Sequence, residues 1–149
     1  MVIEEMTEED CRAMLARTHV ARLGCAQNNQ PYVVPISVYF DGRDALYCPT
    51  TLGQKIEWMR HNPLVCVQMD EVITQWHWLS LIVFGRYEEL PNTYEYEAER
   101  QIAEGLFVAH GVWWEPASVP LAGGHEQHLR ITFRINIARM TGRRAQVSP

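Results

Sequence analysis

The most regular alternation of hydrophobic and polar residues lies near the C-terminal end of the chain. From Leu129 to Ile137 every second residue is apolar, and the residues between them are Arg130, Thr132, Arg134 and Asn136. A period of two residues is typical of a β-strand with one buried face and one polar face. The sequence therefore predicts a strand over residues 129–137.

Shorter apolar segments, separated by turn-forming residues, predict five more strands. They cover residues 18–26, 31–40, 45–48, 64–69 and 76–90. Pro35 lies inside the second of them and cannot donate a ladder hydrogen bond, so it indicates an edge strand, a bulge or a barrel corner. The last of them is apolar on both faces, which indicates that a second subunit covers it. His77, between two tryptophans of this segment, is interpreted as a core or interface histidine.

Three helices are expected between the strands. Thr7 followed by three acidic residues is typical of a helix start, because a hydroxyl caps the first turn and the helix dipole favours negative charge there. A second helix is expected over residues 51–62, ended by Pro63, and a third over residues 92–109. The inward-facing positions of the third are Ile102, Leu106 and Phe107. Strands joined mostly by hairpins favour an antiparallel barrel over a parallel βαβ sheet.

The composition is that of one ordinary globular domain over residues 1–149, with 47% hydrophobic and 21% charged residues. A net charge of −5 gives no electrostatic footprint for nucleic acid, and no apolar run approaches the roughly 20 residues of a membrane span. The N-terminus lacks the apolar core of a signal peptide. The four cysteines include no C-x-x-C pair and are interpreted as reduced thiols of a cytoplasmic protein.

The segment from Tyr47 to Trp58 contains the residues that best indicate a binding site. Thr51 and Gln54 have the spacing of a capping box, in which Thr51 caps the helix and Gln54 reaches back to it. Unpaired N–H groups at a helix start readily bind a phosphate. Gly53 lets an anion approach the backbone closely.

Lys55 is the only lysine among 13 basic residues, and it lies in the first turn of this expected helix. A cation there opposes the helix dipole by up to about 1 kcal/mol, and a bound phosphate reverses that sign. The alternative is a solvated lysine paired with Glu57 or Asp70, and the residues alone leave both readings open. The segment is not a Walker loop, and the chain has no G-x-G-x-x-G motif of a dinucleotide site.

Other polar and aromatic residues are weaker candidates. His125 and His128 lie three residues apart, but the glycines before them and the strand after them indicate a loop, so no metal site is expected. A second group near the end of the third helix forms either an aromatic lid over a planar ligand or ordinary dimer packing. It consists of His110, Trp113 and Trp114. The basic cluster near the C-terminus is interpreted as exposed tail charge or an anion site. Its members are Arg139, Arg143 and Arg144.

Several short motifs occur in one order along nearly the whole chain. They are residues 20–25, 30–37, Tyr47 with 53–55, 60–66, 80–86, 133–137 and 141–143. In this order and spacing they resemble the FMN-binding split-barrel superfamily, and most of all the nitroimidazole-resistance-like branch of the pyridoxamine 5'-phosphate oxidase-related proteins. The resemblance implies a mainly β fold, a six-stranded antiparallel split β-barrel with Greek-key topology.

The same resemblance implies a homodimer that binds FMN at the subunit interface. Pro35, Ile36 and Ser37 then lie along the flavin. The ribityl chain and the phosphate are flanked by the residues that end the third strand, namely Tyr47, Cys48, Pro49, Thr50 and Thr51. Gln54 and Lys55 complete the set, with Lys55 paired to the phosphate. Relatives in this branch often carry a histidine where this chain has Pro49, so chemistry that depends on that histidine is not transferred here.

The function expected from the sequence is an FMN-dependent oxidoreductase that reduces a small electron-poor substrate, such as a nitro compound or a quinone. No catalytic acid or base is identified, and the cofactor carries the electron chemistry. Oxidation of pyridoxamine phosphate is less favoured, because it needs a second phosphate clamp and the single lysine is already assigned. The alternatives are a non-catalytic flavin- or haem-binding module and a deazaflavin-dependent reductase.

Overall fold

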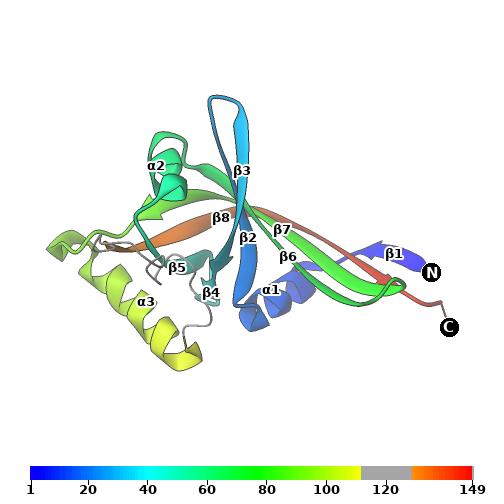
Figure 1. The fold of residues 1–149 in the computed structure, drawn as a ribbon. Coiled ribbons are helices and arrows are strands. Elements are labelled where there is room, and N and C mark those ends of the chain that lie inside the picture. The colour runs from blue at the N-terminus through cyan, green and yellow to red at the C-terminus, as the bar shows by residue number, and fades with distance from the viewer. Residues whose placement is uncertain (112–128, 149) are drawn as a thin grey trace, which may run out of the picture.

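Eight strands form one antiparallel sheet in the computed structural model, which describes residues 1–111 and 129–148 (Figure 1). The strands are β1 (Val2–Glu5), β2 (Val20–Gln27), β3 (Gln30–Ser37), β4 (Tyr39–Phe40), β5 (Ala45–Thr51), β6 (Leu64–Thr74), β7 (His77–Glu89) and β8 (Arg130–Gln146). Their order across the sheet is β3-β2-β6-β7-β8-β5-β4, and β1 pairs with the far end of β8. The protein is therefore mainly β, and the antiparallel architecture expected from the sequence is confirmed.

In the part of the chain that the structure describes, three α-helices and one short 3-10 helix connect the strands. They are α1 (Glu8–Arg17), α2 (Gln54–His61), η1 (Tyr94–Tyr96) and α3 (Glu97–His110). The start of α1 is as predicted, since the Thr7 hydroxyl accepts a hydrogen bond from the backbone N–H of Asp10 at 3.1 Å. None of the helices in the described ranges is long and apolar enough to cross a lipid bilayer.

The β2–β3 hairpin ends in a tight turn at Asn28 and Asn29. Both have positive φ angles, 50° and 65°, which asparagine tolerates better than most residues and which match the twist of a two-residue hairpin. β3 is an edge strand, and its Pro35 pairs with Arg22 of β2. The chain then breaks at Val38 before β4, so both the edge and the corner that this proline indicated are present.

Two separate hydrophobic clusters pack on the two faces of the sheet. The main core lies between the strands, α1 and α2, and includes Leu23, Met59 and Phe133. The second cluster lies under α3, where Ala103 and Phe107 pack on the opposite face of β4 and β5. Its other buried members are Tyr39, Ala45, Tyr47 and Leu90. β5 is therefore buried on both sides along its whole length.

Several predicted boundaries need correction. The six expected strands become eight, because β1 was not predicted and the segment 31–40 is divided into β3 and β4. β8 runs to Gln146 rather than ending at Ile137, since its second half pairs with both β7 and β1. Strand pairing also places Thr51 in β5, opposite Arg130, so α2 begins later than expected.

The helix predicted over residues 92–109 also differs in detail. It consists of η1 followed by α3, and its buried residues are Ala103 and Phe107. Ile102 is 48% exposed and does not face inward. His77 is likewise exposed and is not a core residue. The predicted irregular stretch with Trp113, Trp114, His125 and His128 lies outside the described residues.

Candidate functional site

The predicted binding residues on β5 do not share one face of the sheet. Successive side chains of a strand point in opposite directions, and Cys48 packs in the main core whereas Tyr47 packs in the second cluster under α3. By the same alternation Thr50 shares the face of Cys48, while Pro49 and Thr51 share the face of Tyr47. All five are buried. A ligand on the α3 side of the sheet can therefore contact the side chains of Tyr47, Pro49 and Thr51. The side chains of Cys48 and Thr50 face the main core instead.

The predicted residues on β3 divide in the same way. Ile36 is 6% exposed and belongs to the main core, so its side chain faces away from the α3 side. Ser37, next along the strand, is buried, and Pro35 is exposed. The structure thus brings the end of β3 near β5. Ile36, like Cys48, packs in the main core and supports the two strands from that side.

The start of α2 is open rather than closed by a capping box. The N-cap residue is Gly53, with a φ of −171°, and no side chain caps the helix. The predicted pair of Thr51 and Gln54 is therefore wrong, and Gln54 is exposed. A Cβ atom added at Gly53 would meet nothing within 4 Å. Uncapped N–H groups beside open space are the arrangement to which a phosphate binds.

Lys55 is buried at this helix start, which argues against the alternative of a solvated surface lysine. Its exposed fraction is 8%, and the next residue, Ile56, is fully buried where α2 packs on β2. Burial and the neighbouring Cys66 raise the pKa of the Cys25 thiol, and the Lys55 ammonium opposes them. The charge of the Lys55 ammonium is therefore felt by the buried Cys25 side chain. Because charges interact more strongly where water is excluded, it reinforces the positive potential of the α2 N-terminus.

A charged network at the middle of β5 was not predicted from the sequence. The Tyr47 hydroxyl accepts a hydrogen bond from Arg134 Nη1 at 3.3 Å, and Arg134 Nε donates to Glu88 at 2.5 Å. Burial would lower the pKa of Arg134, but its hydrogen bonds to Glu88 and Tyr47 raise it. Burial would likewise raise the pKa of Glu88, but hydrogen bonds from Arg134 and Asn136 lower it. The pair therefore stays charged and holds the Tyr47 ring in place.

A second feature missed by the sequence analysis is a buried carboxylate oxygen on α3. Glu99 Oε2 is shielded from solvent and has no hydrogen-bond partner among residues 1–111 and 129–148. Glu99 precedes Ala103 by four residues and Phe107 by eight, so it lies on the face of α3 that packs over Tyr39 and Tyr47. An orphaned buried acceptor is uncommon in a folded protein and indicates a place where a ligand or water supplies a donor.

His110, one of the predicted lid residues, ends α3 in a cluster of three rings. Its ring centroid lies 4.7 Å from that of His19 and 6.2 Å from that of Tyr39. The Tyr39 hydroxyl donates to the carbonyl of Gly111 at 2.9 Å and so ties β4 to the end of α3. Within residues 1–111 and 129–148, no three histidine, cysteine or acidic side chains come together as a metal site.

An apolar hollow of about 550 Å³ lies on the outer face of the sheet, opposite the main core. Its lining includes Val33 and Leu64, which are 68% and 65% exposed, and the ring of Phe84. Gly24 forms its floor, because a Cβ there would lie only 2.8 Å from the Sγ atom of Cys66. A contiguous apolar patch of this kind is typical of a surface that binds another protein.

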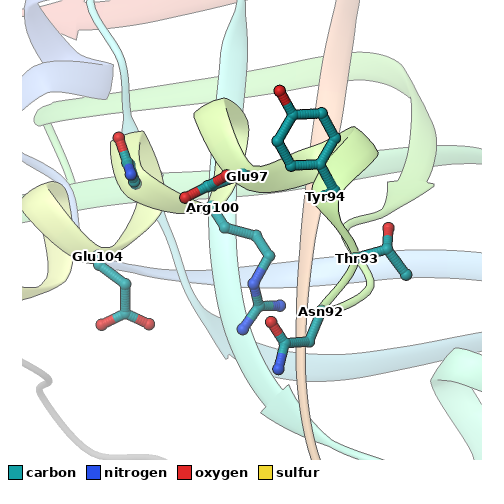
Figure 2. A pocket seen from close by; sticks show the side chains of 7 residues that line it. Asn92, Thr93, Tyr94, Glu97, Arg100 and Glu104 are labelled. Carbon is teal, nitrogen blue, oxygen red and sulfur yellow. The ribbon is translucent and has the colours of Figure 1, made fainter.

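A pocket of about 560 Å³ is lined by residues of η1, of α3 and of the segment just before them (Figure 2). Figure 2 shows the Arg100 side chain extending from α3 toward Asn92, and its Nη1 donates to the carbonyl of Leu90 at 2.7 Å. Glu97 and Glu104 also line the pocket. It contains none of the residues predicted to bind a cofactor.

Comparisons with known proteins agree with this fold. The pyridoxamine 5'-phosphate oxidase family model matches residues 7–144. A protein of Rhizobium meliloti, named only as uncharacterized, is 40% identical over 149 residues and is matched over 97% of both chains. The crystal structure of an FAD-binding protein from Mesorhizobium loti has a TM-score of 0.79 and 37% identity, over 99% of both chains. A candidate 5-nitroimidazole antibiotic resistance protein from Bacteroides thetaiotaomicron has a TM-score of 0.67 and 17% identity, over 96% of this chain and 89% of that one, and supports the fold alone.

Proposed function

The chain belongs to the pyridoxamine 5'-phosphate oxidase family, and from this membership we propose that it is a flavoprotein that binds FMN. The proposal is supported by the Mesorhizobium loti structure, whose protein is named as FAD-binding. FMN and FAD share the phosphate next to the ribityl chain, so one anchor serves either flavin. The observation that carries the proposal is the buried Lys55 at the uncapped start of α2.

The residues at this site fit a flavin phosphate. Open space beside Gly53 leaves the first N–H groups of α2 accessible, and the dipole of the helix and the Lys55 charge both favour an anion there. Thr51, the last residue of β5, adds a hydroxyl close by in the chain. Lys55 therefore holds the phosphate, while α2, fixed by its buried residue Ile56, positions it.

The alternation of side chains refines which predicted residues face the cofactor. Ser37, Pro49 and Thr51 lie on the α3 side of the sheet and contact the ligand through their side chains. Ile36 and Cys48 support the site from the main core, as does Thr50 by its position on the strand. When bound, the flavin supplies hydride and electron transfer. The protein residues bind it, orient it and exclude water.

The proposed assembly is a homodimer, in which the two subunits contact each other through the apolar hollow on the outer face of the sheet. Val33 and Leu64 are largely exposed in a single subunit. Covering them is favourable, because each Å² of apolar surface removed from water contributes about 25 cal/mol. The half-buried outer face of β7, with Ile82 and Phe84, continues this surface. The dimer thus explains why β7 is apolar on both faces.

The proposed reaction is the reduction of a small electron-poor molecule, such as a nitro compound or a quinone. The side chains assigned to the site are prolines, hydroxyls and an ammonium, which position a flavin rather than transfer protons. Such a site suits a reaction in which the cofactor delivers the electrons and the substrate accepts them readily. Reduction of nitrofurazone and of menadione by the flavin-loaded protein tests this part, with NADH, NADPH or dithionite supplied as the electron donor that reduces the flavin in each cycle.

Flavin titration tests the cofactor assignment. Flavin fluorescence and absorbance are followed for the wild type and for Lys55→Met, which keeps the volume of the side chain but removes its charge. Loss of a charge-assisted hydrogen bond is expected to weaken FMN binding roughly 10- to 100-fold and to leave riboflavin, which lacks the phosphate, unchanged. Arg86→Met, an exposed cation on β7, is the matched control. Equal FMN affinity in the wild type and Lys55→Met, or a Soret band of haem in the purified protein, would overturn the assignment.

The mass of the protein in solution tests the dimer. The wild type is expected to elute with about twice the chain mass of 17.3 kDa in light-scattering chromatography. Leu64→Asp places a charge in the apolar hollow and is expected to shift the population toward monomer. Val108→Asp, which changes an 82% exposed residue on α3, serves as the control. A wild-type monomer, or equal dissociation by both variants, argues against this interface.

A further inference from the structure

Two ion pairs join the ends of helices to strands of the sheet. Arg17, the last residue of α1, pairs with Glu71 of β6. Arg60, in the last turn of α2, pairs with Glu89 of β7. Both pairs are bidentate, with N···O distances of 2.7 and 3.2 Å in the first and 2.8 and 3.1 Å in the second. Two parallel hydrogen bonds fix an orientation as well as a distance, so each pair constrains the direction of its helix.

A third ion pair involves the basic cluster near the C-terminus. Arg144 pairs with Glu4 of β1 and Asp10 of α1. The other two members of the cluster, Arg139 and Arg143, lie on β8 as Arg144 does. The interpretation of these arginines as tail charge is therefore corrected, and their ion pair does not involve α2.

Glu89 is held by the core of the protein as well as by Arg60. The Tyr87 hydroxyl donates to Glu89 Oε1 at 2.6 Å, and the Tyr87 ring packs on Phe133 in the main core, with 5.3 Å between the ring centroids. Burial, more than the bond to Glu89, raises the pKa of Tyr87, so its hydroxyl stays protonated and donates. The hydrogen bond from Arg60 outweighs burial and lowers the pKa of Glu89, so Glu89 stays a carboxylate. Arg60, Glu89 and Tyr87 together form the α2 clamp.

α2 depends on such contacts for its orientation. It has eight residues, and no side chain among the described residues caps its start; a helix this short is not stable by itself in water. Its start is held by the buried Ile56, and its end by Arg60 and by Asn62, whose Nδ2 donates to the carbonyl of Ala26 at 3.0 Å. Lys55 and Arg60 are five residues apart, or roughly 7 Å along the helix axis. Because so short a helix moves as a rigid rod, releasing its end turns the N–H groups and the lysine at its start.

From these contacts we infer that Glu89 is a positioning residue for the phosphate group of the bound flavin. Through Arg60 it sets the direction in which the start of α2 presents its N–H groups and Lys55 to the anion. Tyr87 ties the Glu89 carboxylate to the core, so that the α2 clamp has a rigid base. The identity of the anion rests on the proposed function, whereas the α2 clamp rests on its own geometry.

Orientation and charge make opposite predictions for one member of the ion pair. Glu89→Gln removes a negative charge near α2 and leaves Arg60 unpaired, so by charge alone it would strengthen phosphate binding. Arg60→Gln removes a positive charge and by charge alone would weaken that binding. If the α2 clamp acts through orientation, both variants weaken phosphate binding, because both release the end of α2. A weaker affinity in Glu89→Gln is therefore the decisive sign.

Titrations with FMN and riboflavin, followed by flavin fluorescence at constant ionic strength, test the inference. Glu89→Gln and Arg60→Gln are each expected to weaken FMN binding three- to tenfold, and the double variant no more than either single one, because all three lose the same contact. Riboflavin has no phosphate, so its affinity should stay within twofold of the wild type in all three. Arg60→Lys keeps the charge but not the planar set of donors, and it should regain part of the FMN affinity that Arg60→Gln loses.

Glu71→Gln is the matched control, because it breaks the other bidentate pair and leaves α2 untouched. Its FMN affinity should stay within twofold of the wild type. Unchanged or tighter FMN binding in Glu89→Gln, an equal loss in Glu71→Gln, or an equal loss for riboflavin would overturn the inference. Lys55→Met separates this result from the proposed function: if it binds FMN as the wild type does, the phosphate is not at α2 and the proposed function fails first.

Hydrogen exchange of the flavin-free protein tests the α2 clamp without a ligand. In Glu89→Gln the backbone amides of residues 58–62 are expected to exchange at least threefold faster than in the wild type, and those of α1 at the same rate. Glu71→Gln should show the reverse. If the wild type binds no FMN, the proposed function is wrong, and this exchange alone decides whether Glu89 holds α2. Equal exchange of α2 in the wild type and Glu89→Gln contradicts the inference.

Discussion

The two ends of β5 carry charge in different ways. After Thr51 a single lysine is buried at the start of a helix, with a core residue directly beside it. Before Ala45 a cavity open to solvent is lined by charges of both signs, with Arg12 and Glu8 from α1 and Arg43 and Asp44 from the β4–β5 turn. The first arrangement is encoded in a few consecutive residues, and the second exists only after folding. The buried charge is largely shielded from salt, while the exposed charges are screened by it.

The largest expected effect concerns the stability of the buried end. Ile56→Ala removes a fully buried side chain through which α2 is fixed to the barrel, and such deletions cost about 2–5 kcal/mol of the free energy of unfolding. Urea denaturation followed by circular dichroism measures the change. Ile102→Ala removes the same groups from a residue that is 48% exposed on α3, so its cost should stay under about 1 kcal/mol. Equal costs for the two variants would mean that α2 is not locked by the core.

A smaller effect is expected where charge rather than packing is changed at the same end. Gly53→Asp places a carboxylate at the N-cap of α2, where the extended backbone and the open space accept a side chain. Capping should raise the stability by a few tenths of a kcal/mol, while the negative charge should weaken FMN binding tenfold or more. Gly53→Asn caps in the same way without the charge, and it should weaken FMN binding much less. If both variants bind FMN as the wild type does, the phosphate is not at this helix start.

The contrast between the ends also explains how much the sequence alone predicted. The α1 cap at Thr7 follows from local chemistry, is visible within a few residues and is confirmed. The phosphate-binding role of Lys55 comes from the same kind of local signal and stays a prediction. The capping box failed because Thr51 gains a place in the β5–β8 ladder opposite Arg130, and strand pairing outweighed a local cap. That competition is not visible in the segment itself.

The cavity before Ala45 and the charged network on β5 were missed for a related reason. Arg12 and Arg43 are 31 residues apart in the chain, and only the fold places both on the wall of one cavity. Tyr47 meets Arg134 because the two are paired in the register of β5 and β8. The sequence indicated that Arg134 lies on the polar face of its strand, but it contained no signal for the strand that lies beside it.

The smallest expected effect lies between the two ends, where the charged network holds Tyr47. The pKa of Glu88 is lowered in the folded protein by its hydrogen bonds from Arg134 and Asn136, which outweigh its burial. A lowered pKa contributes stability that is present above the unfolded pKa, near 4.3, and is lost as the pH falls through the folded value. Glu88→Gln should therefore be less stable than the wild type at pH 7, by under about 1 kcal/mol because the pair is still partly exposed to solvent, and the difference should shrink below about pH 4. Thermal unfolding between pH 3 and pH 8 measures this, with Glu95→Gln, an exposed residue of η1, as the control. A difference that does not vary with pH would show that Glu88 acts through packing rather than charge, and that the middle of β5 resembles its buried end.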